Sequence, residues 1–454
     1  MGGVISESCK MQAVKALESN VRSYSRSFPA IFSRARGSTM LTEGGRNVID
    51  FLSGAGALNY GHNNHQIKAA IAEYLASDAV VHRLDMATPA RLEFMETFSA
   101  FILRQRGLQY RFQFTGPTDA NAIEAALKLS RKVTGRQNIV SFTHGYHGMS
   151  VGALAASGNR FHRTGSGVPL SGATFMPYDG YLGPGVDTAD YLQKVLMDES
   201  SGIDCPAALL VETVQGEGGI NVASKEWLQS IQALARNVGA LLIVDDIQMG
   251  CGRTGEFFSF EFAALSPDIV VLSKSLSGYG LPLSMLLIKD GLDAWRPGEH
   301  TGTFRGNNLA LVSATAAINL YWRSRTFSQG VQRMGELARR RLEAVASEYG
   351  NSFAVRGRGM ALGFDCQMAE IAAATTCKAF EKGLIVERCG PVDQVVKFLP
   401  ALTIDSKTLN QGLEIFQESL AEALIQTGSD PKKETSWPTR PSNMRSPSRS
   451  SPSP

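Results

Sequence analysis

Two short apolar segments constrain the fold more than any other part of the chain. Residues 241–245, LLIVD, end in a carboxylate, and residues 269–274, IVVLSK, end in a lysine. Short runs of apolar and β-branched residues are typical of buried parallel strands. Open α/β sheets bind their ligands at the edge where the carboxyl ends of the strands meet. We therefore expect Asp245 and Lys274 to lie at the ligand-binding edge of one sheet.

An acid and a lysine at such an edge suit one particular chemistry. A lysine amine forms a Schiff base with an aldehyde, and a carboxylate facing it can hold a pyridinium nitrogen in its protonated form. This is the pairing that pyridoxal phosphate chemistry requires. The alternative is that the lysine is a solvated loop residue and the aspartate a turn former.

The rest of the chain continues this alternation of strands and helices. One strand is expected to end at Phe114, and two others open the segments Ile139–Gly148 and Ala208–Gly219. Each is an apolar run that ends in polar or glycine-rich residues, and helical patterns separate them. Such an alternation predicts a doubly wound α/β fold with a mostly parallel sheet.

Periodicity and turn residues locate the other elements. Gly44 and Gly45 separate two β-like runs in Leu41–Leu52, which predicts a hairpin. Helices are expected at Ile67–Ala76, Pro89–Arg104, Lys225–Val238, Gly330–Tyr349, Ala369–Lys382 and Leu409–Ile425, and further strands at Met360–Cys366 and Val395–Phe398. The expected divisions are an N-terminal arm with the start of a small domain (1–52), a large domain (53–325), a C-terminal small domain (326–427) and a disordered Pro/Ser-rich tail (428–454).

The segment FQFTGPTDANAIEAALK, residues 112–128, predicts a strand, a turn and a helix. The free backbone N–H groups and the positive end of such a helix form a phosphate site. Its candidate contacts are Thr118, Asp119 and Ala120. The alternative is an ordinary strand–helix unit in which Thr118 or Asp119 serves only as N-cap.

Further polar residues are expected near the same edge. Tyr146 and His147 are candidates to lie flat on a planar ring, or else they form a buried aromatic pair. Glu212 and Glu217 follow the third strand and can hold a cation, a guanidinium or only water. Both are candidate substrate contacts. Thr303 can offer its hydroxyl to a phosphate group, or make a local turn hydrogen bond.

Composition excludes several classes of protein. The 454 residues include 45 basic and 42 acidic side chains, a net charge of +3 with no basic block in the globular part, so we expect no nucleic-acid partner. The six cysteines show no CxxC spacing, which favours reduced thiols in a cytoplasmic protein and gives no reason to expect a metal site. We expect no signal peptide and no membrane span. The GxGxxG motif of nicotinamide-dependent enzymes does not follow the first strand.

Three motifs, in this order, carry a resemblance to a known family. They are VDDIQMGCGRTG, PDIVVLSKSLSGYGLP and HTGTFRGN. Over roughly residues 20–425 the chain resembles the class III (ω-type) aminotransferases. The resemblance implies a fold-type I enzyme with pyridoxal 5′-phosphate as cofactor, a large domain, a smaller α+β domain and an assembly of at least two subunits. A non-catalytic homologue remains an alternative.

The resemblance also implies roles for individual residues. Lys274 would bind the cofactor covalently, Asp245 would pair with its ring nitrogen, and Gln248 would reach its ring hydroxyl. Tyr146 would stack on the ring. Thr303 would contact the phosphate group bound by the neighbouring subunit.

Four segments resemble, within this family, the branch that produces L-2,4-diaminobutyrate for ectoine biosynthesis. They are ESNVRSYSRSFP, FTGPTDANAIEAALKLSRKVTGR, SKSLSGYGLPLS and EHTGTFRGNN. This resemblance implies amino transfer from L-glutamate to L-aspartate 4-semialdehyde, with Glu217 gating the pocket. Other ω-amines such as ornithine, acetylornithine or 4-aminobutyrate are alternative substrates.

The sequence departs from the family pattern at two positions. Asp119 stands where the phosphate loop usually has glycine, and a carboxylate there repels a phosphate dianion. Lys397 stands where many members have arginine. Lysine is a point charge and cannot grip a carboxylate with a planar fork. The diaminobutyrate branch resembles this chain in having lysine at that position.

Overall fold

The computed structural model describes residues 7–350 and 352–428. Its main element is a seven-stranded sheet in the order β4-β12-β11-β10-β7-β5-β6. The strands are β4 (Tyr110–Phe114), β5 (Ile139–Phe142), β6 (Ala173–Met176), β7 (Ala208–Val211), β10 (Leu241–Asp245), β11 (Ile269–Leu272) and β12 (Met285–Lys289). Only β12 runs against its neighbours, β11 and β4, so the sheet is mostly parallel. The predicted α/β class is confirmed.

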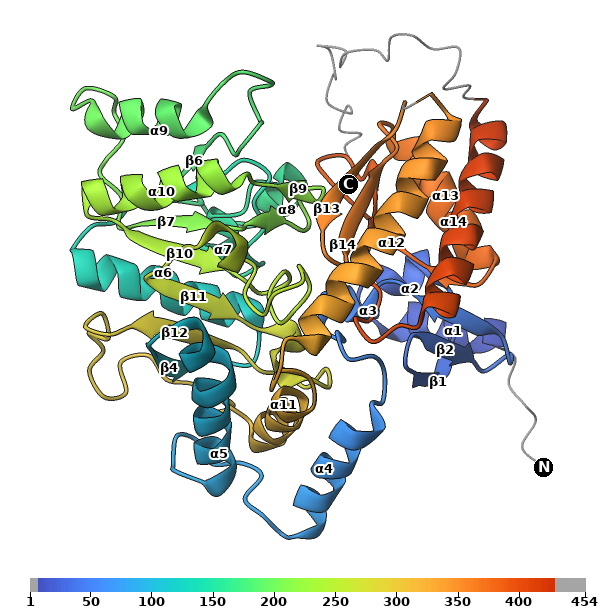
Figure 1. Cartoon of the computed structure of the whole chain (residues 1–454), viewed down its shortest axis with the longest axis horizontal. Helices are drawn as coiled ribbons and strands as arrows, with labels where there is room; N and C mark the ends of the chain where they lie inside the picture. The colour runs from blue at the N-terminus through green and yellow to red at the C-terminus, as the bar shows by residue number, and fades with distance from the viewer. Residues whose placement is uncertain (1–6, 351, 429–454) are drawn as a thin grey trace, which may run out of the picture.

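Helices cover both faces of this sheet (Figure 1). Every residue of β7, β10 and β11 is buried, which explains why these strands read as continuous apolar runs. Leu242 and Val244 belong to the same hydrophobic cluster as Trp227 on helix α10 (Lys225–Val238). Ile243 points the other way and clusters with Ile123 on helix α6 (Asp119–Thr134). Both faces of β10 are therefore inside the protein.

The chain ends build a second region beside the large sheet (Figure 1). One four-stranded sheet has the order β13-β14-β17-β16, and another has the order β1-β2-β3-β15. Their strands are β1 (Phe32–Arg36), β2 (Thr39–Thr42), β3 (Asn47–Asp50), β13 (Ala354–Arg358), β14 (Ala361–Asp365), β15 (Leu384–Ile385), β16 (Glu387–Cys389) and β17 (Val395–Phe398). Since β15 pairs in parallel with β3, the N-terminal segment is part of the C-terminal region.

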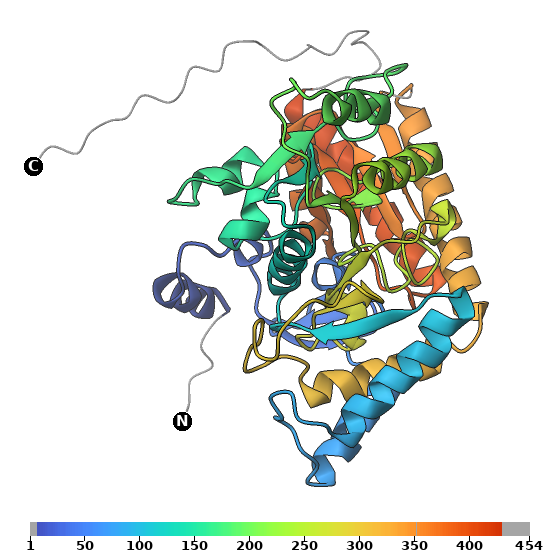
Figure 2. The same ribbon diagram turned by 90° about the vertical axis from the view of Figure 1, so that its left-hand side faces the viewer.

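Long helices pack on these smaller sheets. They are α12 (Thr326–Glu348), α13 (Ala369–Glu381) and α14 (Ser406–Thr427). Phe364, Phe398 and Phe416 form the centre of a separate hydrophobic cluster there. Figure 2 shows the N-terminal helix α1 (Glu7–Leu17) projecting from the body.

A buried arginine ties the large sheet to the C-terminal region. The Arg253 guanidinium is fully buried and donates hydrogen bonds to Oδ1 of Asn59 at 2.6 Å and to the carbonyl oxygens of Pro400 at 2.6 Å and Met360 at 3.2 Å. Asn59 in turn donates to the carbonyl of Cys251 at 3.0 Å. Three segments that are distant in sequence thus meet at one side chain.

Most elements predicted from the sequence are present, with one difference at the end of a helix. The helix expected at Pro89–Arg104 ends at Phe98 as α5 (Pro89–Phe98), and a π-helical turn, Ser99–Leu103, follows. The N-cap of α6 is Thr118, and Asp119 is the first helical residue. The predicted disordered tail lies, apart from Gly428, outside the described residues.

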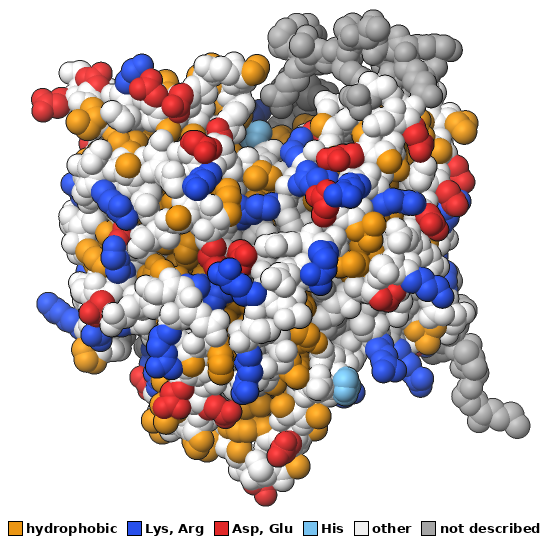
Figure 3. Space-filling view, viewed as in Figure 1, with side chains coloured by type: hydrophobic (Ala, Val, Ile, Leu, Met, Phe, Trp, Pro, Cys, Tyr) orange, Lys and Arg blue, Asp and Glu red, His pale blue; other side chains and the backbone are white. Residues whose placement is uncertain are grey.

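The surface charges and the helices relate to two partners that the sequence did not lead us to expect, nucleic acid and membrane. On the face shown in Figure 3, basic and acidic side chains are interspersed, in keeping with the small net charge. Among residues 7–350 and 352–428, each helix is too short or too polar to cross a bilayer.

Candidate active site

Lys274 lies two residues after the end of β11, at the carboxyl edge of the large sheet. Its backbone adopts a left-handed φ of 49°, a conformation that costs a non-glycine residue roughly 1–3 kcal/mol and is often kept at functional sites. Its Nζ donates a hydrogen bond to the carbonyl of Ala55 at 3.0 Å. Next to it, the Ser275 hydroxyl donates to the carbonyl of Gly56 at 2.7 Å. The loop around Ala55 therefore fixes the position of the lysine.

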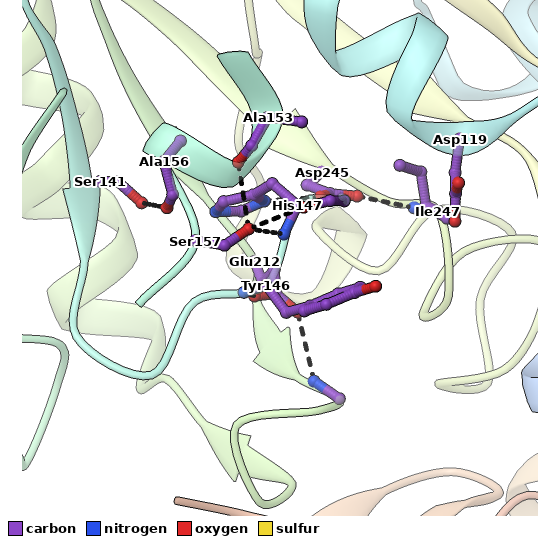
Figure 4. A network of polar contacts seen from close by, with 12 residues as sticks. Asp119, Ser141, Tyr146, His147, Ala153, Ala156, Ser157, Glu212, Asp245 and Ile247 are labelled. Atoms are coloured by element: carbon purple, nitrogen blue, oxygen red, sulfur yellow. Dashed lines mark hydrogen bonds and ion pairs between the residues drawn. The ribbon is translucent and has the colours of Figure 1, made fainter. Parts of the chain in front are cut away.

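Asp245 ends the neighbouring strand β10 and is buried. Its Oδ2 lies 2.7 Å from Nδ1 of His147, and its Oδ1 accepts a hydrogen bond from the Ile247 N–H at 3.1 Å (Figure 4). Burial lowers the pKa of His147, but the hydrogen bond and charge of Asp245 outweigh burial and raise it above the usual value. The Ser157 hydroxyl accepts a hydrogen bond from the His147 backbone N–H at 2.9 Å. His147 and the Ile247 backbone thus hold the aspartate in a fixed orientation.

Tyr146 and His147 were predicted to lie on a planar ring, and the structure separates the two side chains. The His147 ring is buried against Asp245. The Tyr146 ring is half-buried, and burial, together with the charges of Glu217 and Asp119, raises the pKa of its hydroxyl to about 12. Tyr146 therefore remains the candidate for stacking, whereas His147 acts on Asp245.

Glu212 was predicted as a substrate contact, and the structure gives it a different position. Its Oε1 accepts the backbone N–H of Tyr146 at 3.0 Å and its Oε2 that of Gly216 at 3.2 Å. Burial raises the pKa of this carboxyl to about 7, against the opposing charge of His147. With both oxygens used by backbone groups, Glu212 joins two loops of the site and does not present a free carboxylate.

Gln248 connects the loop around Ala55 to the carboxylate of Glu217. Its Nε2 donates to the carbonyl of Ala55 at 3.0 Å and to Oε1 of Glu217 at 3.1 Å. Its Oε1 is buried and has no hydrogen-bond partner among the described residues. A buried acceptor without a donor is rare and indicates a missing donor group. Gln248 is therefore placed to accept a hydrogen bond from a bound molecule.

Lys397 is fully buried on β17 between two carboxylates. Its Nζ lies 2.6 Å from Oε1 of Glu217 and 3.0 Å from Oε1 of Glu387. Burial raises the pKa of Glu217, but the charges of Lys397 and Lys274 and two hydrogen bonds bring it down to about 2. Burial lowers the pKa of Lys397, but the two carboxylates raise it well above its usual value. Gln248 bonds both to Glu217 and to the Ala55 carbonyl that accepts from Lys274, so these residues share one site.

The predicted turn is present at the start of α6. One of its backbone N–H groups already donates to the side chain of Asp119. Oδ1 of Asp119 accepts the backbone N–H of Ala120 at 2.8 Å. Asn121 donates its N–H to the Thr118 carbonyl at 3.1 Å. Thr303 lies on an exposed loop, where its carbonyl is 3.0 Å from Nε2 of His82.

Three residues of the candidate site were not predicted from the sequence. Glu387, Tyr24 and Ala55 carry no motif that sets them apart. Tyr24 and Glu387 are 363 positions apart and meet through a hydrogen bond of 3.2 Å. Ala55 contributes a backbone carbonyl, which any residue type would supply, so only the folded chain reveals its role.

Comparisons with known proteins agree with this arrangement. The family model "Aminotransferase class-III" matches residues 21–420. An uncharacterized aminotransferase, y4qG, of Sinorhizobium fredii is 60% identical over 92% of this chain and 94% of its own. The diaminobutyrate–2-oxoglutarate transaminases of Bordetella parapertussis and Halomonas elongata are 57% and 51% identical, over 90% and 91% of this chain and 94% and 99% of their own.

Solved structures extend the similarity to the fold. The ornithine aminotransferase of Toxoplasma gondii ME49 superimposes with a TM-score of 0.80 at 24% identity, covering 93% of this chain and 97% of its own. An aminotransferase of Bacillus anthracis gives a TM-score of 0.81 at 22% identity, covering 91% and 98%. With the family model matching most of its length and relatives far above 30% identity, the chain belongs to the class III aminotransferase family.

Proposed function

We propose that this protein is a pyridoxal phosphate-dependent aminotransferase that moves the amino group of L-glutamate to L-aspartate 4-semialdehyde. The products are 2-oxoglutarate and L-2,4-diaminobutyrate. The substrates are proposed from the relatives of 51–57% identity that carry the name diaminobutyrate–2-oxoglutarate transaminase. The observation that carries the chemistry is the placement of Lys274 and Asp245 after adjacent strands of one parallel sheet.

The residues at the sheet edge fit this cofactor. Gln248 has a buried oxygen that can accept from the ring hydroxyl, and Asp245 has the negative charge that a pyridinium N–H requires. Lys274 provides the amine. The start of α6 fits the phosphate group less well, because the Asp119 carboxylate already accepts one of its N–H groups.

Each residue has a defined task in the proposed reaction. Bound pyridoxal phosphate supplies an aldehyde that condenses with amines and a ring that takes up electrons from the substrate carbon. Lys274 would hold the cofactor aldehyde through Nζ, and its free amine would move a proton between the substrate carbon and the cofactor side. Asp245 would pair with the ring nitrogen, and His147 orients Asp245 through the 2.7 Å contact between Nδ1 and Oδ2. Tyr146 bounds the ring on one face.

Glu217 and Lys397 are proposed to distinguish the two substrates. L-Glutamate carries a carboxylate on the carbon that reacts, whereas L-2,4-diaminobutyrate reacts at a terminal carbon that carries none. While Glu217 pairs with Lys397, the ammonium group has no charge left to offer a substrate carboxylate. This arrangement fits L-2,4-diaminobutyrate, which has no carboxylate on its reacting carbon. When Glu217 moves away, Lys397 can bind the carboxylate of the first. The same pocket thus serves both half-reactions.

We further propose an assembly of at least two subunits, in which Thr303 of one reaches the phosphate group bound by the other. In the single chain, Thr303 is exposed. Replacing Thr303 by alanine is expected to weaken cofactor binding in the assembled protein. Unchanged affinity would remove Thr303 from the site.

A screen of amino donors and acceptors, with and without added pyridoxal phosphate, tests the proposed function. We expect turnover with L-glutamate and L-aspartate 4-semialdehyde that depends on the cofactor. Preference for ornithine, acetylornithine or 4-aminobutyrate would reassign the substrate within the family. Absence of turnover and of cofactor absorbance would favour a non-catalytic role.

A further inference from the structure

Lys397 is held by two carboxylates of unequal mobility. Glu387 lies on β16 and is the direct cross-strand neighbour of Lys397 on β17. Its Oε2 also accepts a hydrogen bond from the Tyr24 hydroxyl at 3.2 Å. Glu217 instead lies in the loop between β8 (Val214–Gln215) and β9 (Asn221–Val222). The side chain of Glu217 is 33% exposed, whereas that of Glu387 is 9% exposed. Glu217 also accepts a second hydrogen bond, from Gln248 at 3.1 Å, but it lies in a loop and is the more exposed of the two carboxylates. We therefore take Glu387 as the fixed partner and Glu217 as the movable one.

The hydrogen bonds of Lys397 are also unequal. Its Nζ donates to Glu217 at 2.6 Å. Oε1 of Glu387 is only 3.0 Å away, yet it is buried and receives no hydrogen bond from any described residue. An ammonium group has three donors in a rotatable arrangement. A small rotation of Nζ can therefore move a hydrogen bond from Glu217 to Glu387.

A fully buried ammonium without a counter-ion loses its proton, because burial disfavours the charged form by several pKa units. The proposed exchange on Lys397 removes Glu217 before a substrate carboxylate arrives. Glu387 and the Cys389 thiol also act on Lys397, and the hydroxyls of Tyr24 and Tyr146 lie within its electrostatic reach. Glu387 is thus the carboxylate that remains beside Lys397 during the exchange.

We propose that Glu387 is a positioning residue, the permanent counter-ion that keeps Lys397 charged and in place while Glu217 and a substrate carboxylate exchange on it. This inference rests on the proposed function, since it assumes one substrate with a carboxylate on the reacting carbon and one without. It also accounts for lysine at a position where many family members have arginine. Lysine lacks the planar fork of arginine, but the second carboxylate restricts where its charge can lie. Departure of Glu217 removes a negative charge that raises the pKa of Glu387, which favours the ionised form of Glu387 when it is needed.

The test measures each half-reaction separately, as single turnovers of the purified holoenzyme with L-glutamate and with L-2,4-diaminobutyrate. In Glu387→Gln we expect kcat/KM for L-glutamate to fall about 10-fold at pH 8.5 and much less at pH 6.5. Once Glu217 has left, the buried Lys397 amine has no counter-ion in this variant, and its pKa drops into this range. The diaminobutyrate half-reaction, in which Glu217 stays on Lys397, should change less than about 2-fold by the same reasoning. Tyr24→Phe should shift the L-glutamate half-reaction in the same direction by a smaller factor.

Glu370→Gln is the matched control, since Glu370 is an exposed glutamate on α13 of the same region. It should leave both half-reactions unchanged. Equal losses in both half-reactions of Glu387→Gln, or a loss independent of pH, would overturn the inference in favour of a purely structural role. If the unaltered enzyme does not turn over diaminobutyrate, the proposed substrate is wrong. In that case the same comparison of half-reactions is made with L-glutamate and the ω-amine that does react.

Discussion

Asp119 places a carboxylate at the first turn of α6, the helix end where the cofactor phosphate is proposed to bind. Its Oδ1 also takes the Ala120 N–H at 2.8 Å, one of the few free donors at that end. Replacing Asp119 by glycine removes the charge and frees the donor. We therefore expect Asp119→Gly to bind pyridoxal phosphate more tightly than the unaltered protein.

The expected gain has two parts. Two unit charges about 4 Å apart repel by about 1 kcal/mol in water and about 4 kcal/mol at an effective dielectric constant of 20. The freed Ala120 N–H adds roughly 0.5–1.5 kcal/mol as a hydrogen bond to the phosphate. Together these predict at least about a 10-fold lower dissociation constant. The protein without cofactor should become less stable, because an acid in the first turn of a helix contributes about 0.3–1 kcal/mol.

The assay is a titration of cofactor-free protein with pyridoxal phosphate, followed by the change in protein fluorescence. Pyridoxal without the phosphate group is the ligand control, and its affinity should not change. Asp119→Asn is the protein control, since it removes the charge and keeps a side-chain acceptor for Ala120. It should recover the electrostatic part only. Equal or weaker binding of pyridoxal phosphate by Asp119→Gly would refute the reasoning.

Three further changes have defined outcomes. Gly216→Ala places a methyl group against Oε1 of Gln248, so kcat/KM should fall about 10- to 100-fold while thermal unfolding changes little; normal kinetics would contradict this. Arg253→Met leaves several buried oxygens without donors and should lower the free energy of unfolding by roughly 2–5 kcal/mol in urea titrations; a loss below about 1 kcal/mol would show that the arginine is dispensable. Burial raises the pKa of Asp246 to about 7, so the native state holds this proton after the unfolded state has lost it, and stability falls as pH rises between about 4 and 7. Asp246→Asn should remove up to about 1.4 kcal/mol per pH unit of that fall. If the free energy of unfolding of the variant and of the unaltered protein changed in parallel with pH, Asp246 would not be the group responsible.

The local parts of the site could be predicted from the sequence. Asp245 and Lys274 each follow directly on an apolar strand, so their place at the sheet edge depends only on the strands being parallel neighbours. The same holds for the turn before α6. The reversed direction of β12 was not predicted, because an apolar run has the same appearance in either direction.

Contacts between distant segments could not be predicted. The pairing of Lys397 with Glu387 depends on the register of β16 against β17, which a short strand does not encode by itself. The orientation of Glu212 depends on where two loops place their backbone N–H groups. Its carboxylate was expected to face a substrate, and instead it stabilises the loops.

The central claim is that the amine of Lys274 binds the cofactor aldehyde while Asp245 supports the opposite side of the ring. Borohydride reduction of the protein with bound pyridoxal phosphate, followed by proteolysis and mass spectrometry of the peptides, tests this most directly. We expect one pyridoxyl group per chain on the peptide that contains Lys274, and none after Lys274→Ala. A label on another lysine, or no label at all, would contradict it.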